Sequence, residues 1–279
     1  MSRMVIRRVL LDAFGTVFSP REPVFRQYAA VARQFGLDVK EEEVKNGFKQ
    51  AFKQWKKDYP LYGKHSNPPL DPSDWWSGVI QDTFRNAGIG REILDPVRSD
   101  LSSTLVHRFW GKEGYELHSD VPPFLSSLAS LSPPSAASPF PPPAIVSNTD
   151  PSVSRVLRSL GVLAPEARDG IREEEVWTTW EIEEAKTSAE FWKEVLRRLR
   201  RTSGEDLKAE GVLVIGDEVD SDYHTPRAAG FRSLLLRRSP DAEHPNASYE
   251  AEKEGLEADV EVVGSLEEAV EWIRRQNSA

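Results

Sequence analysis

The chain has 279 residues, of which 36 are basic and 45 acidic, so its formal net charge at pH 7 is −9. This charge disfavours nucleic acid as a partner, and a hydrophobic content of 39% excludes an intrinsically disordered chain. The absence of cysteine excludes disulfides, thiolate nucleophiles and cysteine-ligated metal sites. No apolar run approaches the ~20 residues of a membrane span, and the first residues lack the pattern of a signal peptide. We therefore expect a cytoplasmic or nuclear protein with no membrane partner.

The first predicted element is a buried strand near the start of the chain. An apolar run over residues 9–11 leads into Asp12, and Gly15 and Thr16 follow within a few positions. This pattern is typical of a strand that delivers a side chain to a loop at the edge of a sheet. Over residues 20–111, by contrast, apolar residues recur every three or four positions and no alternating strand pattern is found. That segment is therefore predicted to be an all-helical insertion after the first strand.

The rest of the chain alternates between strands and helices. Apolar runs predict strands at residues 144–146, 175–180, 211–215, 233–236 and 260–263. Amphipathic helical patterns separate them, and this alternation is typical of an α/β fold with a doubly wound parallel sheet. We therefore expect two domains, an α/β core at residues 1–19 and 112–279 and a helical domain at residues 20–111.

Three of the predicted strands end in polar side chains. Asp12 follows the first strand, Ser147 and Asn148 end the second, and Asp217 follows the strand at residues 211–215. Because the carboxyl ends of parallel strands meet at one edge of a sheet, we expect these side chains to converge. A carboxylate there can attack phosphorus or carbon and form a covalent intermediate. Neighbouring hydroxyl and amide groups can hold a phosphoryl oxygen.

Two further charged residues complete the candidate site. Lys186 can neutralise charge on the nucleophile and the substrate. Asp217 and Asp222 supply hard oxygen ligands for Mg²⁺, or a carboxylate that activates a water molecule. Taken singly, Asp12 is equally well explained as a loop cap, and a loop cap or a solvated charge explains Ser147, Asn148 and Lys186 better than a site does. Their order along the chain is what favours a site.

These residues resemble the four motifs of the haloacid dehalogenase-like hydrolase superfamily. The matching motifs are Asp12-x-x-Gly15-Thr16, Ser147-Asn148, Lys186, and Gly216-Asp217 followed by Asp222. The resemblance implies a Rossmann-like core with a helical cap inserted between the first and second motifs. Other motifs resemble, more narrowly, the eukaryotic group called haloacid dehalogenase-like hydrolase domain-containing protein 3 and its fungal relatives. These motifs are residues 58–64, Trp75-Trp76, residues 145–150 and residues 180–182.

The resemblance implies a role for each matching position. Asp12 would be the nucleophile, and Lys186 the lysine that balances its charge. The residues implied to bind a small-molecule substrate are Thr16, Ser147 and Asn148. Mg²⁺ would be the cofactor of a phosphatase-type member. Its implied ligands are Asp12, the backbone carbonyl of Phe14, Asp217 and Asp222.

The sequence departs from the phosphatase pattern at Phe14. Phosphatase members carry there a second aspartate, which protonates the leaving group, and phenylalanine cannot donate a proton. Loss of a positioned general acid lowers a rate by roughly 10²- to 10⁴-fold. The first hypothesis is therefore a phosphatase-type hydrolase in which the proton for the leaving group comes from an unusual source. That source is the substrate, water or a cap residue such as His65, unless the substrate has a good leaving group.

Two alternatives remain open. An aromatic residue at the position of Phe14 resembles the true 2-haloacid dehalogenases, which displace halide from carbon and need no metal. Those enzymes receive the halide with a cap arginine, and residues 41–57 contain none. The other alternative is a catalytically silent protein that keeps the fold as a binding scaffold. Phe14 favours it, but a decayed site has no reason to keep four buried charges together.

Overall fold

The computed structural model describes residues 5–131, 140–163, 170–203, 206–238 and 260–278. The contacts within the chain divide it into two compact units. The core unit comprises Met1–Ser19, Leu117–Thr149 and Leu160–Ala279, and the helical unit comprises Pro20–Glu116 and Asp150–Ser159. Among the residues described, none of the helices combines the length and apolar character that crossing a membrane requires.

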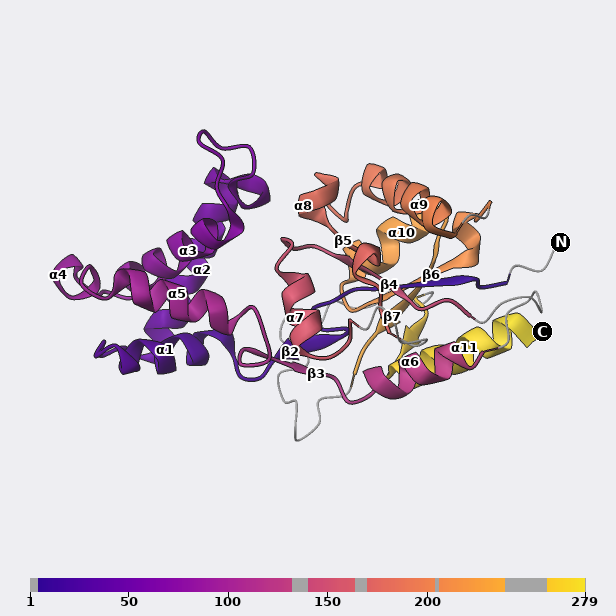
Figure 1. The fold of residues 1–279 in the computed structure, drawn as a ribbon, viewed down its shortest axis with the longest axis horizontal. Coiled ribbons are helices and arrows are strands. Elements are labelled where there is room, and N and C mark those ends of the chain that lie inside the picture. Colours follow the sequence, from indigo (N-terminus) through magenta and orange to yellow (C-terminus); the bar gives the residue numbers. More distant parts are fainter. Residues whose placement is uncertain (1–4, 132–139, 164–169, 204–205, 239–259, 279) are drawn as a thin grey trace. The chain divides into compact units, whose positions relative to one another are not determined.

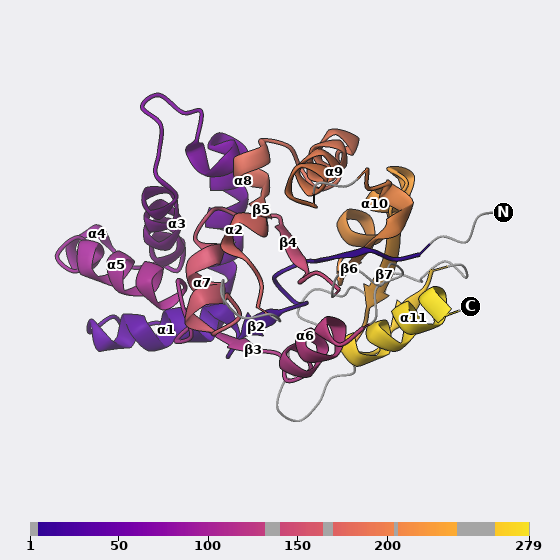
Figure 2. The same cartoon turned by 45° about the vertical axis from the view of Figure 1, so that its right-hand side comes forward.

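The core unit is built on a six-stranded parallel sheet with the strand order β5-β4-β1-β6-β7-β8 (Figure 1). Its strands are β1 Arg8–Leu11, β4 Ala144–Ser147, β5 Val176–Thr178, β6 Val212–Gly216, β7 Arg232–Leu236 and β8 Val262–Val263. Helices α9 (Ala189–Ser203) and α10 (Thr225–Ala228) lie on one face, and α6 (Val121–Ala129) and α11 (Leu266–Ser278) on the other (Figures 1 and 2). The predicted α/β class with a doubly wound parallel sheet is confirmed.

The position of β1 in the middle of the sheet brings the strand ends together. Leu11 pairs with Ile145 of β4 on one side and with Ile215 of β6 on the other. All four residues of β1 are buried, as are those of β4 and β6, which explains their almost continuous apolar sequence. Because the three strands run parallel and in register, the residues that follow them leave the sheet at the same edge.

The helical unit is inserted after β1. Its helices are α1 Val24–Gln34, α2 Glu41–Asp58, η1 Pro60–Gly63, α3 Pro72–Asn86, α4 Arg91–Leu94, α5 Arg98–Arg108 and α7 Val153–Ser159. Residues 21–114, all of them described, contain no strand. A short pairing of β2 (Phe18–Pro20) with β3 (Tyr115–Leu117) joins the two ends of the insertion.

The helical unit extends beyond the segment 20–111 that the sequence suggested. It also includes residues 112–116 and Asp150–Ser159, which the sequence analysis assigned to the core. Two contacts explain why Asp150–Ser159 belong to the helical unit. The indole nitrogen of Trp76 donates a hydrogen bond to Asp150 Oδ2 at 2.9 Å, and the guanidinium of Arg155 lies 4.3 Å above the ring of Trp110. Sequence periodicity cannot reveal such contacts between distant segments.

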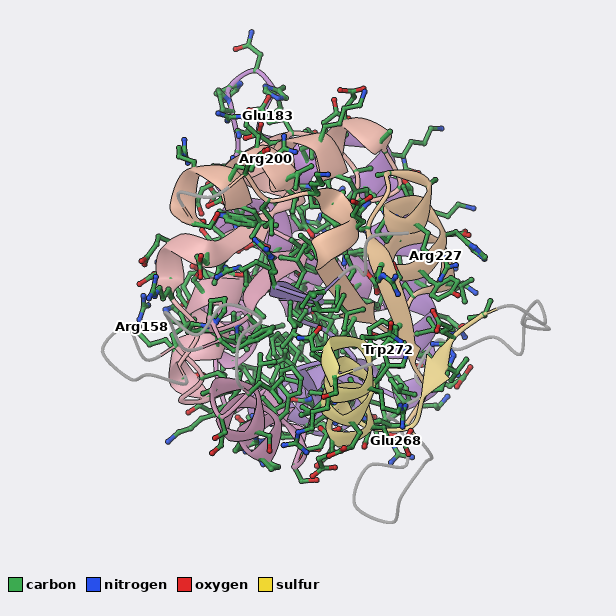
Figure 3. All side chains as sticks on the ribbon, turned by 90° about the vertical axis from the view of Figure 1, so that its right-hand side faces the viewer. Arg158, Glu183, Arg200, Arg227, Glu268 and Trp272 are labelled. Atoms are coloured by element: carbon green, nitrogen blue, oxygen red, sulfur yellow. The ribbon has the colours of Figure 1, made fainter. Side chains whose placement is uncertain are left out.

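Side chains from two helices hold the edge strand β8 in place. The carboxylate of Glu261, which precedes this strand, accepts hydrogen bonds of 3.4 Å from Arg227 and from Trp272 of α11. Both donors are labelled in Figure 3. The remaining short elements of the core are α8 (Thr179–Ile182), the 3₁₀ helices η2 (Glu173–Glu175) and η3 (Ala209–Gly211), and the π-helix η4 (Val219–His224).

A buried ion pair links β1 to the segment before β5. Arg8 Nη2 lies 2.7 Å from Glu175 Oε1, and both side chains are almost fully buried. Removing one partner leaves the other charge unpaired in a medium of low polarity. We predict that Glu175→Ala lowers the free energy of unfolding by about 3–5 kcal/mol, measured by urea denaturation.

The matched control for this prediction removes both charges. In the double variant Arg8→Met/Glu175→Leu no charge is left unpaired, so most of the lost stability should return. If Glu175→Ala alone unfolds with nearly the wild-type free energy, the pair does not contribute as described.

Candidate active site

Asp12 lies at the carboxyl end of the central strand. Its backbone N–H donates to Ile215 O at 2.9 Å, which extends the β1–β6 ladder by one residue and fixes the start of the loop. Its side chain is buried. A carboxylate in this position is held by the sheet itself, so its orientation does not depend on a mobile loop.

The ammonium of Lys186 lies between two carboxylates. Its Nζ is 2.6 Å from Asp12 Oδ1 and 2.5 Å from Asp222 Oδ1, and it donates to Val146 O at 3.1 Å. Two hydrogen bonds and a second ion pair thus offset the burial of the ammonium. The side chain of Lys186 is 1% exposed. The structure therefore places the predicted lysine in direct contact with the predicted nucleophile.

The indole of Trp192 holds the backbone of Lys186. Trp192 lies in α9 with no exposed surface, and its Nε1 donates to Lys186 O at 2.7 Å. This bond fixes the short loop between α8 and α9. Trp192 thus positions the lysine, although its sequence pattern indicates only a buried helix face.

Asp222 is held by its own loop as well as by the lysine. Its Oδ2 accepts the backbone N–H of Glu218 at 3.0 Å, and its side chain has no exposed surface. A Cβ atom on Gly216 would lie 2.3 Å from Asp222 Cγ. Only glycine at the end of β6 lets this carboxylate pack against the strand and reach Lys186.

Asp217 lies against the loop that follows Asp12. Thr16 Oγ1 donates to Asp217 Oδ1 at 2.9 Å. Gly15 has φ +76, and a Cβ atom there would lie 2.3 Å from Asp217 Oδ2. Glycine at this position meets two requirements, a left-handed backbone conformation and close approach of a carboxylate. Thr16, implied to bind substrate, is fully buried and uses its hydroxyl to hold Asp217.

An arginine that the sequence analysis missed supports the same loop. Arg238 donates to Gly15 O and Thr16 O, both at 2.8 Å, and pairs with Asp120 at 2.8 and 3.0 Å. Asp120 Oδ2 also accepts the backbone N–H of Leu266 at 3.0 Å. Arg238 comes just after β7, so the strand-end criterion that identified Asp12 would also have found it. No such signal marks Asp120.

The charges in this cluster do not balance. Three carboxylates, those of Asp12, Asp217 and Asp222, surround one ammonium. Burial raises the pKa of Asp12 well above its usual range, against the attraction of Lys186. Burial and the charge of Asp222 raise the pKa of Asp217 to about 7. Burial lowers the pKa of Lys186, but its two carboxylate partners outweigh this and keep the pKa above the usual value.

The cluster fits a divalent cation. One oxygen from each of the three carboxylates lies within 4.8 Å of the other two. Carboxylate oxygens are the ligands that Mg²⁺ prefers, and a bound cation would balance the excess negative charge. The residues present are therefore suited to Mg²⁺. The carbonyl of Phe14, the remaining implied ligand, stays a prediction.

The other predicted site residues come from β4 and from the loop after β1. Ser147 is buried, and its Oγ has no hydrogen-bond partner among the described residues. Asn148 is exposed, and its Oδ1 accepts a hydrogen bond from Thr179 at 3.2 Å. The side chain of Phe14 is 37% exposed, and its ring packs edge-on against Phe18 with 4.7 Å between centroids.

Comparisons with known proteins show the family to which the chain belongs. A family model described as HAD-hydrolase-like matches residues 184–269. The haloacid dehalogenase-like hydrolase domain-containing protein 3 of Danio rerio is 30% identical over 237 residues, which cover 85% of this chain and 87% of that protein. The protein YMR130W of Saccharomyces cerevisiae is 28% identical over 239 residues, which cover 83% of this chain and 72% of that protein.

Two solved structures show the same fold. The 2-haloacid dehalogenase of Pseudomonas syringae pv. Tomato DC3000 aligns with a TM-score of 0.57 at 16% identity, covering 97% of this chain and 99% of that chain. A structure of YfnB from Bacillus subtilis bound to magnesium aligns with a TM-score of 0.56 at 15% identity, covering 96% and 99%. At this level of identity the likeness concerns the fold alone.

The close approach of Gly15 to Asp217 predicts a specific cost of substitution. Gly15→Ala places a Cβ atom in a left-handed residue and against the carboxylate, whereas Gly161, with φ +77, has no atom within 4 Å of such a Cβ. We predict that Gly161→Ala lowers the free energy of unfolding by about 1–2 kcal/mol through backbone strain alone. Gly15→Ala should lower the free energy of unfolding by about 1–3 kcal/mol more than Gly161→Ala does, measured by urea denaturation. Equal costs for the two variants would contradict the described packing of Asp217.

Proposed function

Because the chain belongs to the haloacid dehalogenase-like hydrolase family, we propose that it hydrolyses a small phosphate monoester through a covalent intermediate on Asp12. The observation that carries this proposal is the buried contact between Asp12 and Lys186, beside two further carboxylates. A carboxylate held at a strand end by one cation is oriented for attack, and its neighbours can bind another cation.

The first step is attack on phosphorus. Lys186 holds Oδ1 of Asp12, so Oδ2 remains to form the new bond to phosphorus. The bond between phosphorus and the leaving-group oxygen breaks, and that oxygen departs with the electron pair. The hydroxyl of Ser147, which has no partner among the described residues, is suited to donate to a phosphoryl oxygen.

The second step restores the carboxylate. A water molecule attacks the phosphorus of the aspartyl phosphate, the bond to Asp12 breaks, and inorganic phosphate leaves. The carboxylate of Asp12 that re-forms is stabilised by the ammonium of Lys186. The ion pair with Asp222 holds this ammonium in place. Asp12, Asp217 and Asp222 would hold Mg²⁺, which when bound supplies positive charge to the phosphoryl group.

The helical unit is suited to the role of a cap. It is inserted directly after the segment that carries Asp12, and in many hydrolytic enzymes such an insertion closes over the substrate and excludes water. Substrate choice would then depend on groups of this unit, and the substrate would be a small molecule.

Phe14 defines the class of substrate. A phosphatase without a positioned acid releases its leaving group unprotonated, so substrates with acidic leaving groups, such as aryl or acyl phosphates, are favoured. We predict that Phe14→Asp raises turnover of an alkyl phosphate far more than that of an aryl phosphate, by up to roughly 10²- to 10⁴-fold for the former. Steady-state kinetics with both substrates measures this ratio.

The control for this prediction is Phe14→Leu. It changes the ring contact with Phe18 but adds no proton donor, so the ratio of the two activities should stay at the wild-type value. If Phe14→Asp leaves that ratio unchanged as well, the missing acid is not what limits the enzyme.

The central prediction concerns the nucleophile and the metal. An aryl phosphate should be hydrolysed in the presence of Mg²⁺, and both EDTA and the variant Asp12→Asn should reduce the rate to background. Asp220→Asn is the matched control, because Asp220 is an exposed aspartate of the same short helix as Asp222. Thermal unfolding of all variants checks that they are folded. Equal activity of Asp12→Asn and the wild type would refute the proposal.

A second candidate function is hydrolysis of a carbon–halogen bond. Phe14 favours it, because displacement of halide needs no proton donor for the leaving group. In that reaction Asp12 attacks carbon, halide leaves with the electron pair, and water cleaves the resulting ester. Release of halide from a 2-haloacid in EDTA, together with no aryl phosphatase activity, would select this candidate. The absence of both activities would favour a binding scaffold.

A further inference from the structure

The helical unit contains a groove of its own between α3 and α5, which lie side by side (Figures 1 and 2). Its volume is about 580 Å³, within the range of small-molecule sites. The lining residues are Ser73, Ser77 and Gln81 of α3, Arg98, Ser99, Ser102, Ser103, Val106 and His107 of α5, and Trp110. None of them belongs to the candidate active site.

The groove is polar because of a four-residue repeat in both helices. Ser73, Ser77 and Gln81 follow one another at this spacing along α3, and Ser99, Ser103 and His107 do so along α5. Residues four apart share one face of a helix. Two neighbouring helices normally meet through apolar side chains, whereas these two turn hydroxyl and amide groups toward a common groove.

Ser102 is the residue that points to a ligand. It lines the groove, is 3% exposed, and its buried Oγ has no hydrogen-bond partner among the described residues. A buried hydroxyl left unpaired costs about 1–3 kcal/mol. Thr83 of α3 avoids this cost by donating to Val79 O, four residues back, at 2.7 Å. Ser102 makes no such bond, so a group in the groove would complete it.

The charges around the groove favour an anion. None of the described residues that line the groove is acidic, although the chain has 45 acidic residues. Arg98 is exposed and forms an ion pair with Asp95, but Nη1 lies 3.8 Å from Asp95 Oδ1, beyond hydrogen-bond distance, so its N–H groups can still donate to a ligand. Arg98 and Ser99 also begin α5, where backbone N–H groups lack partners within the helix.

From these observations we propose that the α3–α5 groove binds a small oxyanion, a phosphate or a carboxylate, through the guanidinium of Arg98 and the hydroxyl of Ser102. This site is separate from the proposed catalytic function and does not depend on Asp12. Occupation of the groove would also satisfy the hydroxyl that the free protein leaves unpaired.

Calorimetric titration of the full chain tests the proposal. The protein is the wild-type chain freed of metal by dialysis, in which the three carboxylates of the candidate active site repel an anion. The probes are inorganic phosphate, citrate and, as a neutral control rich in hydroxyl groups, glucose. We expect phosphate or citrate to bind and glucose not to bind. Arg98→Gln and Ser102→Ala should each weaken binding at least tenfold, whereas Arg91→Gln and Thr104→Ala, which alter residues outside the groove, should not.

Thermal unfolding gives a second readout that a merely structural role would not produce. Ser102→Ala removes the unpaired hydroxyl, so this variant should be at least as stable as the wild type without probe yet gain less stability when the probe is added. Binding of phosphate alone or of citrate alone supports the proposal and identifies the anion. Binding of neither anion, equal binding of glucose, or unchanged affinity in both groove variants would overturn it.

Discussion

The rest of the site depends on the buried ammonium of Lys186. It connects Asp12 of the central strand with Asp222 of the loop after β6, so the two strand ends are tied by one cation. A buried charge is stable only when it is paired and hydrogen-bonded, and Lys186 donates hydrogen bonds to Asp12 and Val146 and forms an ion pair with Asp222. Gly216 and Gly15 lack side chains where Asp222 and Asp217 approach the backbone. The cluster can therefore be compact, and its excess negative charge suits it to a metal cation.

Much of the site can be predicted from the sequence because strand ends in a parallel sheet are local signals. An apolar run that stops at a carboxylate identifies Asp12 and Asp217, and the sheet topology then brings them together. The partners of these groups cannot be predicted in this way. Thr16 resembles a substrate-binding residue but donates to Asp217, and Arg238 and Asp120 support the loop across more than 100 residues of sequence. Such contacts depend on tertiary distances, not on local patterns.

The prediction of the fold is limited in the same way, because local sequence patterns do not reveal tertiary contacts. The periodicity of residues 20–111 correctly predicts helices, and the alternation after them predicts the sheet. The assignment of Asp150–Ser159 to the helical unit depends on the contacts of Trp76 and Arg155, which periodicity does not encode.

The central claim is that Asp12 becomes phosphorylated during turnover. The most direct measurement is acid quenching of the protein during hydrolysis of an aryl phosphate with Mg²⁺, followed by proteolysis and mass spectrometry of the peptide that contains residues 9–18. The account predicts a phosphoryl group on Asp12 that is lost on treatment with hydroxylamine, as expected of an acyl phosphate. Turnover without a phosphoryl group on this peptide, or with one on a different residue, would contradict it.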